Sequence, residues 1–232
     1  MSHPQGDADV RAAIRQALSV AVATGLYGIS FGALAVVAGL DLAQTAALSL
    51  LLFSGGSQFA FIGVIGSGGS PVAAVTTAAL LGVRNGLYGV QVAPLLGLRR
   101  SVRPLAAHLT IDESTAVATA QRSPNAIRAG FWWTGIAVFV LWNVFTLVGA
   151  LVGNALGDPR RYGLDAASAA AFLGLVWPRL ASRTAQLVAA LAVVMALALT
   201  PVAPAGFPVL AAAAVAVMLG WRRSPDPRGG TP

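Results

Sequence analysis

The chain lacks cysteine and lysine, and it has few acidic residues. Its 232 residues include no Cys and only 8 Asp and Glu, and every one of its 15 basic side chains is Arg. Without cysteine, disulfides, thiolate metal sites and cysteine nucleophiles are excluded. Charged residues make up 10% of the chain, against roughly 25% in soluble globular domains. The composition therefore indicates a protein that is surrounded mostly by lipid.

Long apolar runs dominate what is present. Hydrophobic residues make up 56% of the chain, and the mean hydropathy is +0.75. Several runs approach the roughly 20 residues that a spanning helix needs; they cover residues 17–39, 42–65, 72–98, 131–156, 164–176, 184–199 and 205–221. Backbone amides in hydrocarbon must bond within their own segment, so these runs should be helices. The sequence predicts an all-α, polytopic membrane protein with about seven spans (six to eight) in one domain, residues 17–221, between polar tails at 1–16 and 222–232.

Most arginines lie at the ends of the apolar runs, where they face lipid headgroups and set the orientation. The net charge of +7 therefore does not indicate a nucleic-acid partner. Arginine-rich, lysine-free usage suggests a GC-rich bacterial genome, and hence the bacterial cytoplasmic (inner) membrane.

The polar segment 104–121 decides the predicted topology. If it lies along the cytoplasmic face, there are seven spans, the N-terminus is outside, and Arg11 and Arg15 lie opposite Arg99, Arg100 and Arg103. If it crosses the bilayer, there are eight spans with both termini inside. The distribution of arginines favours seven spans.

Gly-Leu-Asp occurs at residues 39–41 and again at 163–165, each time leading into an Ala- and Leu-rich segment. The recurrence suggests internal duplication, with possible repeats over 17–98 and 129–200, although a chain this rich in Gly and Leu could repeat three residues by chance. Duplicated halves are frequent in secondary transporters. Asp41 and Asp165 are expected to cap the helices that they precede.

Glycines interrupt the second and third apolar runs, which predicts broken helices. Residues 54–58 read Ser-Gly-Gly-Ser-Gln, and Gly82 and Gly86 flank a second polar group. Glycine costs a helix interior about 1 kcal/mol relative to alanine. A break at Gly55 and Gly56 would direct the free N–H groups of the following half-helix, beside Ser57 and Gln58, toward an anion. The alternative is a close helix crossing through small residues.

Arg84 lies well inside the third run. Because an arginine at a helix centre costs roughly 2.5 to 3.5 kcal/mol, it should face a polar cavity or a carboxylate. Its guanidinium could bind a substrate carboxylate bidentately, with Asn85 and Tyr88 as further contacts. The alternatives are a structural ion pair or a snorkelling arginine, and simple helix packing for its two neighbours.

His108, Asp112 and Glu113 form another polar group. His108 and Asp112 are four residues apart, which predicts one helical face, so the trio could relay protons or bind a coupling cation. The alternative is a solvated interfacial helix. Ser57 and His108 could imitate an intramembrane serine protease, but the absence of a nucleotide loop or of metal-ligand spacing argues against an enzyme. No metal or cofactor site is predicted.

Several of these motifs resemble the AzlC family, the larger subunits of bacterial branched-chain amino acid exporters of the LIV-E type. The resemblance extends from about residue 20 to 200 and is carried by residues 53–60, 77–80, 84–89, 94–96, 108–114, 163–165 and 169–172. It implies gradient-driven export of leucine, isoleucine and valine, with methionine as a further candidate, and pairing with a small AzlD-like membrane subunit. Arg84 would then bind the substrate carboxylate, while Gln58 and the backbone of Gly55 and Gly56 surround its polar head. From the residues alone, a transporter or channel for another small amphipathic solute, or a non-transporting subunit, stays open.

Overall fold

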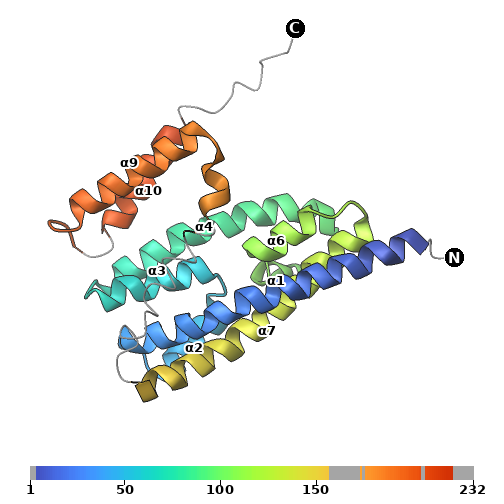
Figure 1. Ribbon diagram of the computed structural model, residues 1–232, viewed down its shortest axis with the longest axis horizontal. Coiled ribbons are helices and arrows are strands. Elements are labelled where there is room, and N and C mark those ends of the chain that lie inside the picture. Colours follow the sequence, from blue (N-terminus) through green and yellow to red (C-terminus); the bar gives the residue numbers. More distant parts are fainter. Residues whose placement is uncertain (1–3, 157–172, 174–175, 205–206, 222–232) are drawn as a thin grey trace, which may run out of the picture.

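Three long helices form the framework of the protein. The computed structural model describes residues 4–156, 173, 176–204 and 207–221, which are mostly helical, as predicted (Figure 1). The framework consists of α1 (Pro4–Val37), α4 (Pro71–Leu96) and α7 (Pro124–Leu156). At 1.5 Å per residue these helices are about 39 to 51 Å long. Within the described residues, α1 and α7 combine the length and hydropathy of membrane-spanning helices.

α1 and α7 run side by side in the same direction, with their backbones close together. Gly25 packs against Leu141, and Gly32 packs against Thr146, so the contacting positions advance together along the two helices. A Cβ atom added to Gly32 would collide with the carbonyl oxygen of Thr146, and one added to Gly149 would collide with α1 in the same way. Small residues at this spacing let helix backbones approach closely in membranes. The seam makes the α1–α7 pair the scaffold of the fold.

The second apolar run forms a hairpin, not the single span expected over 42–65. α2 (Leu42–Leu51) enters the bundle from the end where α1 stops, residues 52–54 break the helix, and α3 (Gly55–Gly66) returns, placing Gly66 against Ala38. Asp41 caps α2, since its carboxylate accepts a 2.7 Å hydrogen bond from the backbone N–H of Gln44. The predicted break beside Gly55 and the predicted Asp41 cap are confirmed. We call residues 42–66 the first hairpin.

The polar segment forms a second hairpin, which enters from the opposite end. α5 (Arg103–His108), preceded by the short turn η1 (Arg100–Val102), and α6 (Asp112–Thr119) are separated by residues 109–111. The chain then returns to the N-terminal half of α1, where Gln121 donates a 3.0 Å hydrogen bond to Gln16. We call residues 103–119 the second hairpin. It forms two short helices at one end of the bundle, and neither the surface segment nor the crossing segment drawn from the sequence has this form. The number of spans stays a prediction.

The predicted break in the third apolar run is also wrong. α4 continues through Gly82 and Gly86 to Leu96. Each glycine costs about 1 kcal/mol relative to alanine, which is less than the several kcal/mol lost for each backbone group left unpaired in hydrocarbon.

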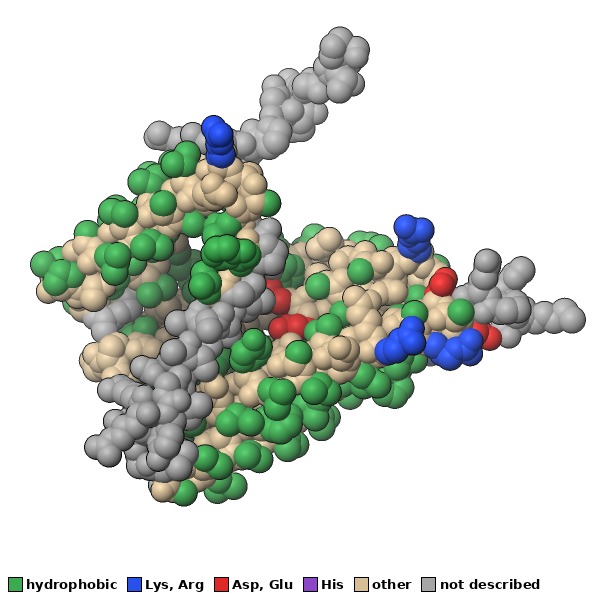
Figure 2. All heavy atoms as spheres, viewed as in Figure 1, with side chains coloured by type: hydrophobic (Ala, Val, Ile, Leu, Met, Phe, Trp, Pro, Cys, Tyr) green, Lys and Arg blue, Asp and Glu red, His purple; other side chains and the backbone are tan. Residues whose placement is uncertain are grey.

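Arginines gather at one end of the bundle, which we call the basic end. The end of α4 meets the start of α7 there, because Arg128 Nε donates a 3.0 Å hydrogen bond to the carbonyl oxygen of Leu96. Figure 2 shows basic side chains at the N-terminal end of α1 and hydrophobic side chains over the flanks. The basic end holds Arg11, Arg15, Arg99, Arg100, Arg103, Arg122 and Arg128. The seven-span arrangement would separate Arg11 and Arg15 from the other five, and the seven-span count stays a prediction.

The remaining helices lie beside α4 in Figure 1. They are η3 (Trp177–Ala181), α9 (Arg183–Leu199) and α10 (Phe207–Trp221), of which the last two pack together and match the apolar runs 184–199 and 205–221. Asp165 and most of the run 164–176 lie outside the described residues, so the proposed repeats 17–98 and 129–200 stay a prediction. At the other terminus, α1 begins at Pro4, so most of the expected tail 1–16 is helix.

Candidate functional site

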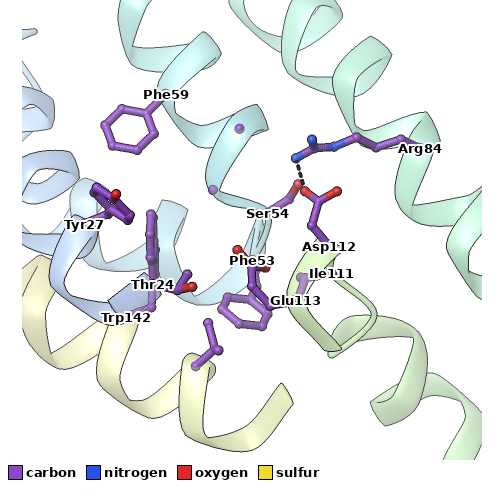
Figure 3. A pocket seen from close by; sticks show the side chains of 13 residues that line it. Thr24, Tyr27, Phe53, Ser54, Phe59, Arg84, Ile111, Asp112, Glu113 and Trp142 are labelled. Atoms are coloured by element: carbon purple, nitrogen blue, oxygen red, sulfur yellow. Dashed lines mark ion pairs between the residues drawn. The ribbon is translucent and has the colours of Figure 1, made fainter. Parts of the chain in front are cut away.

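A cavity of about 400 Å³ lies where the tips of the two hairpins meet, enclosed by α1, α4 and α7 (Figure 3). This size falls within the roughly 300 to 1,000 Å³ of typical small-molecule sites. Its wall combines polar groups from the hairpin tips and α4 with apolar and aromatic groups from the other elements; the lining residues are Thr24, Tyr27, Phe53, Ser54, Gly55, Gly56, Phe59, Arg84, Ile111, Asp112, Glu113, Val138 and Trp142.

An ion pair joins α4 to the second hairpin at the cavity wall. Arg84 Nη2 lies 2.8 Å from Asp112 Oδ2, and the hydroxyl of Tyr88 donates a 2.6 Å hydrogen bond to Asp112 Oδ1. The Arg84 side chain is 27% exposed, so a ligand in the cavity can reach it. The place of Arg84 in an apolar run predicted a carboxylate partner or a polar cavity, and the structure gives it both.

Two buried donors of lining residues have no partner among the residues that the structure describes. They are Arg84 Nε and the indole Nε1 of Trp142. Buried polar groups in proteins are nearly always hydrogen-bonded, so an unmade bond at a cavity needs an explanation. A ligand with acceptor oxygens would supply one.

The first hairpin presents the N-terminus of α3 to the cavity. Gly55 and Gly56 begin this helix and line the wall. The first N–H groups of a helix have no intrahelical acceptor and carry the positive end of the helix dipole. Ser54 stands at the N-cap but makes no side-chain cap bond; its hydroxyl lies 3.2 Å from that of Ser57. The tip thus offers free N–H groups without a charged side chain.

The second hairpin presents carboxylates instead. Asp112 and Glu113 occupy the first turn of α6, where the helix dipole stabilises negative charge. Ser114 fixes the turn, because its hydroxyl donates to the carbonyl oxygen of Leu109 at 2.7 Å and accepts from the backbone N–H of Ile111 at 3.0 Å.

Four of the predicted substrate residues do not line the cavity. Gln58 is fully buried and braces the first hairpin, donating from Nε2 to the carbonyl oxygen of Leu48 at 3.1 Å. Ser57 pairs with Ser54, and Tyr88 reaches the cavity only through Asp112. Asn85 keeps a buried Oδ1 atom without a partner among the described residues. Of the predicted set, Arg84, Gly55 and Gly56 are at the cavity wall.

The prediction that His108 and Asp112 share a helical face is wrong. The break at 109–111 places His108 at the end of α5 and Asp112 at the start of α6. The His108 ring packs between Phe53 and Phe139, with centroid distances of 5.9 and 5.6 Å, and it does not line the cavity. The position of His108 also does not support a protease-like site in which His108 acts as the base for a Ser57 nucleophile. The hydroxyl of Ser57 lies beside that of Ser54 instead.

Sequence reasoning missed the aromatic wall opposite the charged groups. Phe59 packs edge to face on Phe31 and on Trp142, with centroids 5.7 and 6.2 Å apart, and Tyr27 and Val138 also line the cavity. Trp142 offered the one usable signal, because it stands in the middle of an apolar run, whereas anchoring tryptophans concentrate at the ends.

A family model described as AzlC protein matches residues 19–156, which is more than half of the chain and includes every cavity-lining residue. The chain belongs to the AzlC family. It is also 28% identical, over 178 residues, to the inner membrane protein YgaZ of Escherichia coli strain K12, a match that covers 75% of this chain and 71% of YgaZ. No solved structure matches it. Membership of the AzlC family and an inner-membrane relative indicate a membrane transport protein.

Proposed function

We propose that this AzlC protein is a multi-pass, gradient-driven transporter of the bacterial cytoplasmic membrane that exports leucine, isoleucine and valine, with methionine as a further candidate. One observation carries the proposal: the cavity between the hairpins has charged groups on one wall and aromatic and aliphatic side chains on the other. A free branched-chain amino acid has the same division, with a zwitterionic head and an apolar side chain.

Arg84 and the start of α3 would bind the substrate carboxylate. A guanidinium carries five N–H donors in a planar fork, and the contact with Asp112 uses Nη2, which leaves Nε for a second acceptor. Gly55 and Gly56 add the N-terminus of α3, a favourable place for an anion. A carboxylate can therefore bind without displacing Asp112.

The arrangement of the hairpins supports alternating access. Each hairpin arm has 12 or fewer residues, or at most about 18 Å of helix, which is too short to cross a hydrocarbon core of roughly 30 Å. Secondary transporters commonly bind substrate near the midplane between discontinuous helices. Here the two tips meet over the middle of α4, so each hairpin would close the cavity from its own side. The positive-inside rule assigns the basic end, and with it the N-terminus of α1, to the cytoplasm.

The proposed partner is a small AzlD-like membrane subunit. Large apolar side chains along the outer face of α4 are exposed, including Val72 and Val90 at 75% and Leu87 at 67%; they would face lipid or this subunit. A proton or cation gradient would drive export. Asp112 and Glu113 lie at the cavity and are the candidates for coupling, whereas His108 is displaced from it.

Counterflow in proteoliposomes tests the proposal. Vesicles loaded with unlabelled leucine and containing the protein, with and without the co-reconstituted small subunit, should accumulate labelled leucine transiently. Excess isoleucine or valine should suppress this accumulation, and excess glutamate should not. If leucine shows no counterflow in either preparation while another amphipathic solute does, the cavity serves a different substrate.

A further inference from the structure

We infer that Glu113 binds the ammonium group of the substrate, so that the cavity selects α-amino acids over carboxylic acids of the same shape. The inference rests on the proposed transport function. It assigns a binding partner to the ammonium group of the zwitterion, since Arg84 and α3 account only for the carboxylate.

The charges around the cavity do not cancel. Arg84 and Asp112 neutralise each other across 2.8 Å, and Tyr88 takes up the second carboxylate oxygen of Asp112. Glu113, the only glutamate in the chain, also lines the cavity but forms no ion pair with any of the residues described in the structure. Glu113 has a side-chain hydrogen bond with Thr24, but a carboxylate removed from water without a cationic partner is still costly. A cation in the cavity would remove that cost.

The first turn of α6 separates the two carboxylates. Consecutive helix positions differ by about 100° around the axis. Asp112 accordingly points to Arg84 on α4, while Glu113 points to the side of Thr24 on α1 (Figure 3). The polar wall thus has a cationic side, where α3 also begins, and an anionic side. The ammonium and carboxylate groups of an α-amino acid share one carbon atom and can bridge the two sides at once.

The opposite wall then holds the substrate side chain. Phe59 and Trp142 lie on the side of the cavity away from Arg84 and Asp112 (Figure 3), and Val138 also lines the cavity. A ligand anchored at both poles would place its aliphatic group there. A carboxylic acid without the ammonium group would bind Arg84 but leave Glu113 uncompensated, and we expect the cavity to reject it for that reason.

The test compares leucine with 4-methylpentanoate, which has the same carbon skeleton without the ammonium group. In wild-type proteoliposomes, 4-methylpentanoate should fail to inhibit leucine counterflow at concentrations where isoleucine inhibits fully. Glu113→Gln should raise the KM of leucine in counterflow by about tenfold or more and should weaken the preference over 4-methylpentanoate. Glu113→Asp, which keeps the charge, should show a smaller increase in KM and should retain the preference.

Asp41→Asn is the matched control, since asparagine also caps helices well and Asp41 lies outside the cavity; its KM should equal that of wild type. Counterflow needs no net movement of protons, so it separates substrate binding from coupling. If Glu113→Gln loses gradient-driven efflux but keeps wild-type counterflow and selectivity, Glu113 carries the coupling proton and our assignment is wrong. Inhibition of the wild type by 4-methylpentanoate as strong as by isoleucine would also overturn it. Absence of leucine counterflow in the wild type would instead contradict the proposed function itself.

Discussion

The two hairpins reach the same cavity with different chemistry. The first ends in Ser54, Gly55 and Gly56, which carry no charge, and the second ends in Ile111, Asp112 and Glu113. Both use a break of three residues to place the start of a helix in the middle of the bundle. In the first hairpin, the positive N-terminal end of α3 faces the cavity without a charged side chain, so it can interact with a ligand. In the second hairpin, the N-terminal end of α6 stabilises the carboxylates of the protein itself. One backbone arrangement thus supplies both signs of charge to one site.

The hairpins also differ in how they are held. Gln58 ties the two arms of the first hairpin to each other through the carbonyl oxygen of Leu48. Ser114 fixes only the turn of the second hairpin, and the ion pair between Arg84 and Asp112 attaches that hairpin to α4. The position of the second hairpin therefore depends on a group that the proposed substrate also contacts.

Of the variants considered, replacement of Arg84 should lower leucine transport most, because Arg84 both attaches the second hairpin and contacts the proposed substrate. Arg84→Ala removes the proposed carboxylate ligand and leaves Asp112 without its cation, so leucine transport should fall by more than about 100-fold. Transport in proteoliposomes is the measurement, and Arg100→Ala, at the exposed basic end, is the control. The double variant Arg84→Leu with Asp112→Leu should recover thermal stability without transport, because apolar replacement of a buried ion pair is often neutral. Normal leucine export by Arg84→Ala would refute the assigned carboxylate site.

The opposite directions of the two hairpins can be tested by labelling, and the absence of cysteine removes any background. Single variants Asp7→Cys, Ser101→Cys and Ser123→Cys should all react with a membrane-impermeant maleimide from the cytoplasmic side. Ser67→Cys, beyond the first hairpin, should react only from the other side. Labelling of position 7 from outside and of positions 101 and 123 from the cytoplasm would restore the seven-span topology. Labelling of position 101 from outside and of positions 7 and 123 from the cytoplasm would support eight spans.

Substitution at the uncharged tip should have a smaller effect. A Cβ atom at Gly55 would lie 3.3 Å from the indole of Trp142, whereas one at Gly86 meets nothing within 4 Å. Gly55→Ala should therefore raise the leucine KM several-fold by narrowing the cavity beside α3. Gly86→Ala should leave the KM unchanged and add up to about 1 kcal/mol of stability, since alanine favours helix. Equal kinetics in the two variants would show that the first tip is not part of the site.

The smallest effects on transport are expected for Gln58 and Ser114, whose hydrogen bonds hold the hairpins in shape. Gln58→Leu and Ser114→Ala each remove a buried hydrogen-bonding side chain, so each should lower stability by about 1 to 3 kcal/mol. The leucine KM should change less than twofold, because neither residue lines the cavity. Thermal unfolding and counterflow measure the two quantities. A large rise in KM for Gln58→Leu at unchanged stability would return Gln58 to the substrate site, where the sequence placed it.

Local signals in the sequence predicted the parts of the site that depend on a single position. Arg84 is conspicuous because a cation in an apolar run must find a partner, and the residues at 54–58 predicted a break because glycine and serine interrupt a hydrophobic segment. The destination of Arg84 was not predictable, since Asp112 lies beyond a loop and a helix break. Gln58 shows the converse, because an amide that looks like a ligand in the sequence is used to hold two arms together.

Composition alone determined that this chain is helical and belongs in a membrane, because too few of its residues can face water and every amide in lipid must bond within its own helix. The tertiary structure decided that two of the segments turn back within the bundle. An apolar run of 24 residues satisfies the length rule for a span whether it crosses or folds into two arms, and only packing against α4 and α7 distinguishes these outcomes. Those contacts between distant segments bring the two tips to one cavity.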